Sequence, residues 1–169
     1  MLKILVVGAI AVLGVAPLVE ANVPNWKSTA EVILPNGTTI SQRRVVVRLR
    51  SRKVFVYDGN AVIANYRIAV GKRGWETPKG EYRVFSKEVN PTFKNFRTGN
   101  VIKPGPDNPL GVRWIGFWTD GKTQIGFHGT NQPELIGEAV SHGCIRMHNK
   151  DVVKLFEKVS IGTPVSVEP

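Results

Sequence analysis

The sequence predicts a mostly β protein with a single helix near its C-terminus. Short runs of β-branched and aromatic residues follow one another from Arg44 onward, and Asp-Gly pairs separate some of them as hairpin turns. Only one stretch, close to the C-terminus, has apolar residues at helical spacing. The length of 169 residues suits one domain with a short appendage.

The first 21 residues are expected to be a secretory signal peptide. Lys3 gives a short positive region, an uncharged apolar run extends from Ile4 to Val19, and cleavage is expected after Ala21. An uncleaved membrane anchor is the alternative. It is disfavoured because the apolar run would span only about 24 Å as a helix, and Pro17 would end that helix early. We therefore expect the mature chain to work outside the cytoplasm.

The formal net charge of +10 favours anionic partners such as wall polymers, membrane surfaces or acidic peptides. Nucleic acid is disfavoured because the sequence has no helix-turn-helix, zinc-finger or aromatic-basic pattern, and because the chain is expected to be exported. The basic residues are scattered, so a solvated surface without a partner remains an alternative. The single cysteine, Cys144, excludes an internal disulfide.

The elements are expected in the following order. Residues 22–43 form a lead-in segment with an Asn-Gly turn at Asn36, and residues 44–168 form the domain. Composition and period-2 alternation predict strands over 44–49, 53–58 and 61–71, and a Thr-Pro-Lys-Gly turn at 77–80 precedes a strand over 81–86. Two further strands surround an Asp-Gly-Lys turn at 120–122, and the second runs into His128.

The remaining segments are a long loop, a helix and a closing strand. Residues 88–111 are rich in turn residues and lack periodicity, so we expect a functional loop, such as a lid or substrate wall. A short helical turn over 133–139 is predicted. Asn149 is expected to cap the helix, with Asp151 in its first turn. Its apolar face would consist of Val152, Val153, Leu155, Phe156 and Val159. Residues 162–167 give the last strand.

The residues around Cys144 have the parts for acyl transfer. A thiol of ordinary pKa, about 8.5, is only a few per cent thiolate at neutral pH, so a nucleophilic cysteine needs a nearby base or positive charge. His128 and His142 are the available imidazoles, and Arg146 adds a positive charge. Gly143 lets the backbone approach a substrate, and amides of such a turn can point at an oxyanion.

Two other interpretations of these residues stay open. Cys144 could be a buried structural thiol, and His128, His142 and Cys144 could bind zinc with water as a fourth ligand. The zinc site is disfavoured because the chain has no second thiol. Of the imidazoles, His128 is the better base because it ends a predicted strand and could reach across to the loop. His148 is assigned to the exposed start of the helix.

The stretch "HGTNQPELIGEAVSHGCIRMHNKDVVKLF" resembles the catalytic signature of the L,D-transpeptidase family of bacterial cell-wall enzymes. That signature is a histidine followed, a dozen or more residues later, by a Ser/Thr-x-Gly-Cys-hydrophobic-Arg segment. Upstream, "VYDGNAVIANYRIAVGKRGWETPKGEYRV" is similar to the family's first hairpin, its Thr-Pro turn and the next strand, and "GTPVSV" to its closing strand. The resemblance covers Arg44 to Val167 and implies a β-sandwich with mixed sheets, in which the 88–111 loop is a substrate lid.

The resemblance also implies a role for each site residue. Cys144 would be the nucleophile, His128 the general base and acid, and the Gly129 carbonyl the group that orients the imidazole. Backbone amides would form the oxyanion hole, and a cation would fix the loop or attract a substrate carboxylate. The amides are those of His142, Gly143 and Cys144, and the cation is the side chain of Arg146. Ser141 and Asn149 would shape the loop.

The function implied is peptidoglycan L,D-transpeptidation. A monomeric, cofactor-free transferase in the periplasm, or on the wall side of the cytoplasmic membrane, would join a donor tetrapeptide stem to an acceptor amine in a 3→3 crosslink, and so serve cell-wall biogenesis and cell shape. The acyl-enzyme could instead pass to water, as in an L,D-carboxypeptidase, or to a wall protein. A non-catalytic wall-binding module is a further alternative. A papain-like peptidase is disfavoured because there the cysteine precedes its histidine.

Overall fold

The computed structural model describes residues 32–33, 39–40, 42–95 and 98–169. The predicted signal peptide, the Asn36 turn and most of the lead-in segment lie outside these residues. No helix in the described part of the chain is long and apolar enough to cross a membrane.

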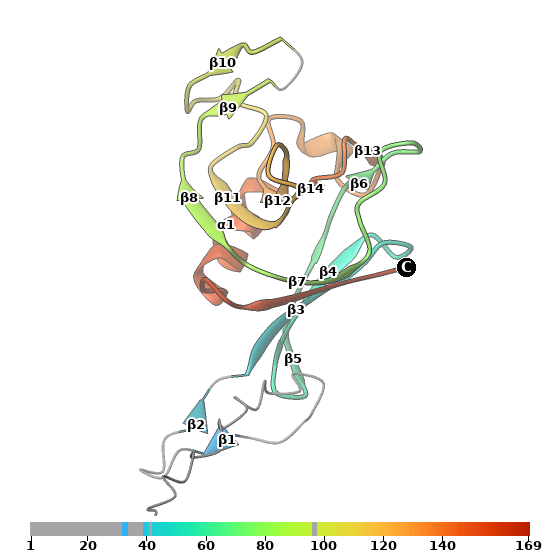
Figure 1. The fold of residues 1–169 in the computed structure, drawn as a ribbon, viewed down its shortest axis with the longest axis vertical. Helices are drawn as coiled ribbons and strands as arrows, with labels where there is room; N and C mark the ends of the chain where they lie inside the picture. Colours follow the sequence, from blue (N-terminus) through green and yellow to red (C-terminus); the bar gives the residue numbers. More distant parts are fainter. Residues whose placement is uncertain (1–31, 34–38, 41, 96–97) are drawn as a thin grey trace, which may run out of the picture.

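A five-stranded mixed sheet forms one half of the domain, in the order β5-β4-β3-β15-β7 (Figure 1). Strand β15, the last in the sequence, lies between β3 and β7, parallel to β3 and antiparallel to β7. The C-terminal strand of the domain therefore pairs with one of its first strands. The bounds are β3 Arg43–Arg48, β4 Lys53–Asp58, β5 Ala61–Arg67, β7 Gly80–Arg83 and β15 Pro164–Glu168.

A four-stranded sheet in the order β14-β12-β11-β8 forms the other half, above the first sheet in Figure 1. Its bounds are β8 Ser86–Val89, β11 Arg113–Thr119, β12 Gln124–His128 and β14 Ile145–Arg146. Here β14 is parallel to β12, and the other pairs are antiparallel. The buried residues of both sheets form one core, which includes Val47, Val56, Ile115 and Phe127. The predicted mostly β fold with mixed sheets is confirmed.

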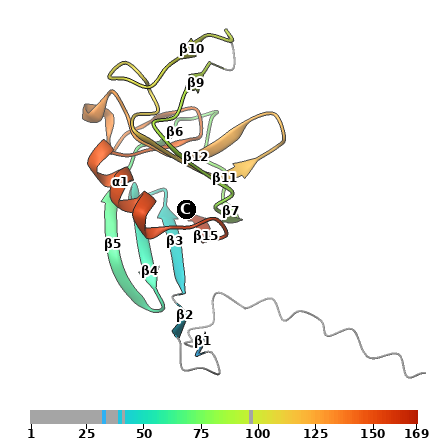
Figure 2. The same cartoon turned by 90° about the vertical axis from the view of Figure 1, so that its left-hand side faces the viewer.

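Helix α1, Asn149–Lys158, lies against β11 and β12 (Figure 2). Val152 and Leu155 of its predicted apolar face are fully buried. The predicted cap is wrong, because the N-cap residue is His148 and Asn149 is the first helical residue. The reason is a tertiary contact. The Asn149 side chain accepts a hydrogen bond from Thr130 N and donates one to Thr130 O, so its side chain does not cap the helix.

Short ladders complete the fold. Residues 61–71 divide into β5 and β6 (Val70–Gly71), and β6 pairs in parallel with β13 (Ala139–Ser141). The predicted turn over 133–139 is only a 3-10 turn at Pro133–Leu135, because Ile136 is extended and Gly137 N bonds to the Ile68 carbonyl instead. The remaining pairs are antiparallel: β1 (Val32–Ile33) with β2 (Thr39–Ile40), and β9 (Phe93–Lys94) with β10 (Val101–Ile102).

The predicted loop over 88–111 therefore contains the end of β8 and the β9–β10 hairpin, which extends from the top of the domain in Figure 1. The chain returns from this hairpin through a proline-rich segment to β11. The role of the loop as a substrate lid stays a prediction.

Candidate active site

Parallel pairing of β12 with β14 brings the predicted base and nucleophile to one end of the smaller sheet. His128, the last residue of β12, is the register partner of Arg146 in β14. Cys144 directly precedes β14 and lies beside Gly126, whose backbone hydrogen bond acts on the thiol. The positive charge of Arg146 acts on both His128 and Cys144. Three residues that are separated in sequence therefore share one environment.

His128 is buried, with 4% of its surface exposed, and its ring stacks against Trp114 at 6.1 Å between centroids. Its Nδ1 lies 2.6 Å from the Gly129 carbonyl oxygen. A carbonyl oxygen only accepts hydrogen bonds, so we assign the proton to Nδ1, which leaves Nε2 with its lone pair as the proton-accepting nitrogen. The structure thus places the Gly129 carbonyl where it can orient the imidazole.

Burial sets the protonation of both partners. It lowers the pKa of His128 to about 4, helped by the charge of Arg146 and opposed by the Gly129 and Pro109 carbonyls. It raises the pKa of the Cys144 thiol, against the Gly126 backbone and Arg146. The sequence suggested that neighbouring groups lower the thiol pKa, and Arg146 does act in that direction, but burial outweighs it. At neutral pH the resting pair is therefore a thiol and a neutral imidazole.

The thiol itself is half-buried and packs against the hydrophobic core, with Sγ 3.8 Å from the Gln124 carbonyl oxygen. A purely structural cysteine would have the same contacts. What distinguishes Cys144 is that it lies two residues before Arg146, the register partner of His128, and that the Arg146 charge acts on its thiol.

Ser141 organises the loop around Cys144. Its hydroxyl donates to the Cys144 carbonyl and accepts from Gly143 N at 3.1 Å. Gly143 has φ +109°, a conformation that L side chains rarely adopt, so the loop requires glycine there. The Gly143 N–H therefore points into the loop in this structure and would have to leave the Ser141 hydroxyl to bind an oxyanion. The His142 ring is exposed and lies edge-on to Trp75, with centroids 4.9 Å apart.

Thr77 is a site residue that the sequence did not reveal. Its side chain is 3% exposed, donates a hydrogen bond to the Gly143 carbonyl at 2.8 Å and accepts one from Gly71 N at 3.2 Å. A further backbone bond joins Lys72 N to Ser141 O at 3.0 Å. The Thr-Pro turn was predicted only as a connection between strands, and no local pattern marks its threonine as buried. The turn in fact supports the cysteine loop through the hydrogen bond from Thr77 to the Gly143 carbonyl.

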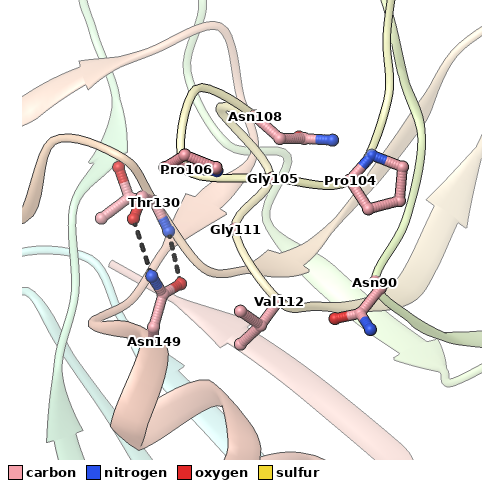
Figure 3. A pocket seen from close by; sticks show the side chains of 9 residues that line it. All are labelled: Asn90, Pro104, Gly105, Pro106, Asn108, Gly111, Val112, Thr130 and Asn149. Atoms are coloured by element: carbon pink, nitrogen blue, oxygen red, sulfur yellow. Dashed lines mark hydrogen bonds between the residues drawn. The ribbon is translucent and has the colours of Figure 1, made fainter.

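Gly129 and Asn149 fix the segment that follows the histidine. Asn149 holds Thr130 by two backbone hydrogen bonds of 3.1 and 3.0 Å (Figure 3). A Cβ on Gly129 would lie 2.0 Å from Asn149 Oδ1, so a larger residue cannot fit at this position without displacing Asn149. The carbonyl that contacts His128 therefore belongs to a rigid segment.

Arg146 is held by its backbone on one side and a neutral amide on the other. Its N–H and C=O pair with Ala69 at 3.0 and 2.9 Å, and its Nη1 donates to Gln132 Oε1 at 3.3 Å. In the described part of the chain it forms no salt bridge. Its charge is therefore not neutralised by a carboxylate of this chain and can act on the site.

A cavity of about 380 Å³ lies beside the Gly129–Thr130 segment and under the proline-rich return from β10 (Figure 3). Neither His128 nor Cys144 lines it. Its walls consist of Asn90, Pro104, Gly105, Pro106, Asn108, Gly111, Val112, Thr130 and Asn149. Asn108, fully buried, ties this wall together by donating to the carbonyls of Pro91, Ile102 and Lys103.

The described residues contain no group of three His, Cys, Asp or Glu side chains that could share a metal ion. The zinc alternative, which used His128, His142 and Cys144, therefore lacks its ligand set in this part of the chain. The His142 ring instead contacts Trp75.

Comparison with known proteins adds relatives of the whole domain. Residues 42–167 match the YkuD family, described as an L,D-transpeptidase catalytic domain. The putative L,D-transpeptidase YqjB of Bacillus subtilis is 45% identical over 126 residues, which are 73% of this chain and 69% of that protein. The putative L,D-transpeptidase YkuD of the same species is 34% identical over 157 residues, 93% of this chain and 84% of that protein.

Among solved structures, a crystal structure of an Enterococcus faecium L,D-transpeptidase with a cysteine-to-serine mutation is 27% identical, with a TM-score of 0.60. The match covers 74% of this chain and 49% of that one, so the chain spans about half the length of this solved relative.

Proposed function

We propose, since the chain belongs to the L,D-transpeptidase family, that it is a peptidoglycan L,D-transpeptidase that forms 3→3 crosslinks through a thioester on Cys144. The observation that carries this proposal is the site geometry. His128 is buried, neutral and oriented with Nε2 as the acceptor, at the end of the strand that pairs with the segment of the only thiol. That arrangement supplies a nucleophile and a base without a cofactor.

The first half-reaction is acylation of Cys144. As Sγ attacks the carbonyl between the third-position diamino acid and the terminal D-Ala of a donor stem, the thiol proton passes to His128 Nε2. The C–N bond then breaks, D-Ala leaves as an amine with that proton, and a thioester remains. Because the pKa of His128 is lowered, its imidazolium is a stronger acid than usual, which suits protonation of an amine leaving group, and its neutral imidazole is correspondingly a weaker base toward the thiol.

In the second half-reaction, the amine of another stem attacks the thioester carbonyl. His128 accepts the amine proton and returns it to the departing sulfur, so the free enzyme is restored with a neutral thiol and a neutral imidazole. The product contains the new amide between two third-position residues. Splitting acyl transfer into two steps in this way is what a nucleophilic cysteine provides.

Backbone amides of the cysteine loop would stabilise the tetrahedral intermediates. In a trans peptide unit the C=O and the next N–H point in opposite directions. Thr77 holds the Gly143 carbonyl, so it also sets the direction of the Cys144 N–H, which we assign as the main oxyanion donor. The predicted donors His142 and Gly143 would add to it once the Gly143 N–H leaves Ser141.

Arg146 and the 88–111 loop would act on the substrate. The Arg146 charge is not neutralised by a carboxylate of the described residues, which supports a role in attracting the carboxylate of the donor stem. The β9–β10 hairpin and the proline-rich return would form the lid, and the cavity beneath them would lie next to the base segment. The basic, exported domain would meet its substrate on the wall side of the membrane.

The test is mass spectrometry of purified muropeptides incubated with the enzyme. A 3→3 dimer together with free D-Ala supports the proposal. Tripeptide without dimer would instead identify an L,D-carboxypeptidase, and unchanged tetrapeptide a wall-binding module. Cys144→Ala is the control, and if it still released D-Ala the thioester mechanism would be wrong.

A further inference from the structure

The outer face of the five-stranded sheet carries charges that the proposed reaction does not use. Val45 and Val47 of β3 point into the hydrophobic core, whereas Val46 between them points to the other face of the sheet, where it is also buried, with 6% of its surface exposed. Side chains alternate along a strand, so Arg44 and Arg48 lie on the outer face with Val46. The loop of Cys144 is built on the other sheet and on the β6–β13 ladder.

Three cations on this outer face lie in one row. The register pairs Arg48 of β3 with Lys53 of β4, and Lys53 with Arg67 of β5. All three side chains are exposed, and neighbouring strands are about 4.8 Å apart. Like charges directly opposite each other destabilise a sheet. The fold therefore keeps a row of repelling charges where alternating charges would be more stable.

Little within the described residues relieves this repulsion. Lys53 and Arg67 take part in no salt bridge there, and Arg48 has one with Glu168, at 3.8 Å with both side chains about half exposed. An exposed pair of this kind contributes little. On the same face the carboxylates lie on the other half of the sheet: Glu168 is on β15, and Glu81 on β7 binds Ser166. No carboxylate is a register partner of Lys53 or Arg67, whereas Glu168 is the register partner of Arg48, and Arg83 lies beside Glu81 on the other half of this face.

The two arginines of the face are supported by aromatic rings. The Arg48 guanidinium lies 4.9 Å from the Phe55 ring centroid, and that of Arg44 lies 4.2 Å from the Tyr57 centroid. Stacking of this kind holds a guanidinium in place while its edge can still donate hydrogen bonds. Within the row, Arg48 is held in this way by Phe55, and the Arg67 guanidinium lies against the Gly137 backbone.

We propose that Arg48, Lys53 and Arg67 form a docking surface for a phosphodiester-linked anionic polymer of the cell envelope. A regular array of cations one strand apart complements a chain that carries a charge at each repeat, and guanidinium groups bind phosphate oxygens in pairs. A bilayer fits less well, because the exposed apolar residues Val62 and Ile63 lie four or five residues from Arg67, at the other end of β5. The row itself has no apolar side chain to insert.

The test is binding of the full chain to linear inorganic polyphosphate, measured by fluorescence anisotropy at low and high salt. The triple variant Arg48→Gln/Lys53→Gln/Arg67→Gln should bind at least tenfold more weakly and show a smaller salt dependence, since fewer counterions are released. The matched control replaces three exposed lysines elsewhere, Lys122, Lys150 and Lys154, with Gln. Both variants lower the formal charge from +10 to +7, so equal losses of affinity would overturn the proposal.

Two further measurements separate docking from a role in folding or in membrane binding. Lys53→Gln removes the central charge of the row, so it should weaken polyphosphate binding and raise Tm. A lower Tm with weaker binding would mean that Lys53 supports the fold, and would overturn the inference. Binding to phosphatidylglycerol vesicles that equals polyphosphate binding, and depends on the same three residues, would replace the polymer with the membrane. D-Ala release from soluble stems should be unchanged in Lys53→Gln.

Discussion

Replacing Thr77 with valine tests whether the Thr-Pro turn positions the cysteine loop. The two side chains have nearly the same shape, so the change removes one hydroxyl without opening a cavity. That hydroxyl donates to the Gly143 carbonyl at 2.8 Å and accepts from Gly71 N at 3.2 Å. Valine leaves both backbone groups without this partner in a place where Thr77 is 3% exposed.

The expected cost follows from these two bonds. A buried polar group that loses its partner costs about 1–3 kcal/mol. The Gly143 carbonyl is buried and should bear most of this cost, whereas Gly71 N is partly buried and can recover some of it from water. The free energy of unfolding should therefore fall by about 2–4 kcal/mol. Thr77→Ser keeps the hydroxyl and should lose only about 1 kcal/mol for the missing methyl group.

The effect on catalysis should exceed the effect on folding. Without Thr77 the Gly143–Cys144 peptide can rotate, and the Cys144 N–H loses its fixed direction. Removing one oxyanion donor costs about 10²–10³ in kcat, so misdirecting one should cost about 10–100-fold, with little change in KM.

The assay is D-Ala release from tetrapeptide stems, per mole of folded enzyme, at a temperature where circular dichroism shows Thr77→Val to be folded. Thr77→Ser should restore most of kcat. If Thr77→Val lost stability but kept the kcat of the unmodified enzyme, Thr77 would be a structural residue only and the oxyanion argument would fail.

Four further outcomes are expected. Incubation with donor stem should add an acyl group to the intact mass of the enzyme, and Cys144→Ala should show no added mass. Because the pKa of folded His128 is about 4 and its ordinary value is 6.5, the unfolded chain binds a proton between these values that the folded chain does not. The free energy of unfolding should thus fall by about 3 kcal/mol as pH drops from 6.5 to 4, and denaturation of His128→Gln should lack this component. Since burial raises the Cys144 pKa, alkylation by iodoacetamide should become rapid only at a pH above the pKa of a free thiol. An alkylation rate that titrates at or below the pKa of a free thiol would contradict the neutral pair. Gly129→Ala should displace Asn149 and lower both Tm and kcat, whereas Gly121→Ala, which has open space but a φ of +86° that strains alanine, should lower Tm and leave kcat unchanged.

Local sequence patterns predicted the strands whose formation depends mainly on local interactions. Composition and turn residues placed β3, β4, β11 and β12 within a residue or two, because β-branched and aromatic residues favour strands and the turns between them are local. The break between β5 and β6 was missed because β6 pairs with β13, which comes much later in the chain. The prediction that Asn149 caps the helix was wrong for a similar reason, since the Asn149 side chain forms hydrogen bonds with the Thr130 backbone.

The sequence predicted only those site residues that belong to the family motif. The resemblance named His128 and Cys144, but nothing local shows that β14 pairs in parallel with β12, which is what brings them together. Thr77 is 66 residues from its partner Gly143, so no periodicity could reveal the bond. Burial likewise decides the sign of both pKa shifts, and burial belongs to the folded chain.

A neutral resting pair of His128 and Cys144 suits a nucleophilic thiol that has no second cysteine beside it. The predicted export places Cys144 where thiols are oxidised, and the chain has no second cysteine to form an internal disulfide. Oxidants and alkylating reagents attack the thiolate, so a raised pKa protects the sulfur while the site is empty. In the proposed reaction, the thiol proton moves to His128 only as the substrate carbonyl enters the site and its oxygen develops negative charge. The burial that makes Cys144 resemble a structural thiol therefore also restricts its reactivity to a bound substrate.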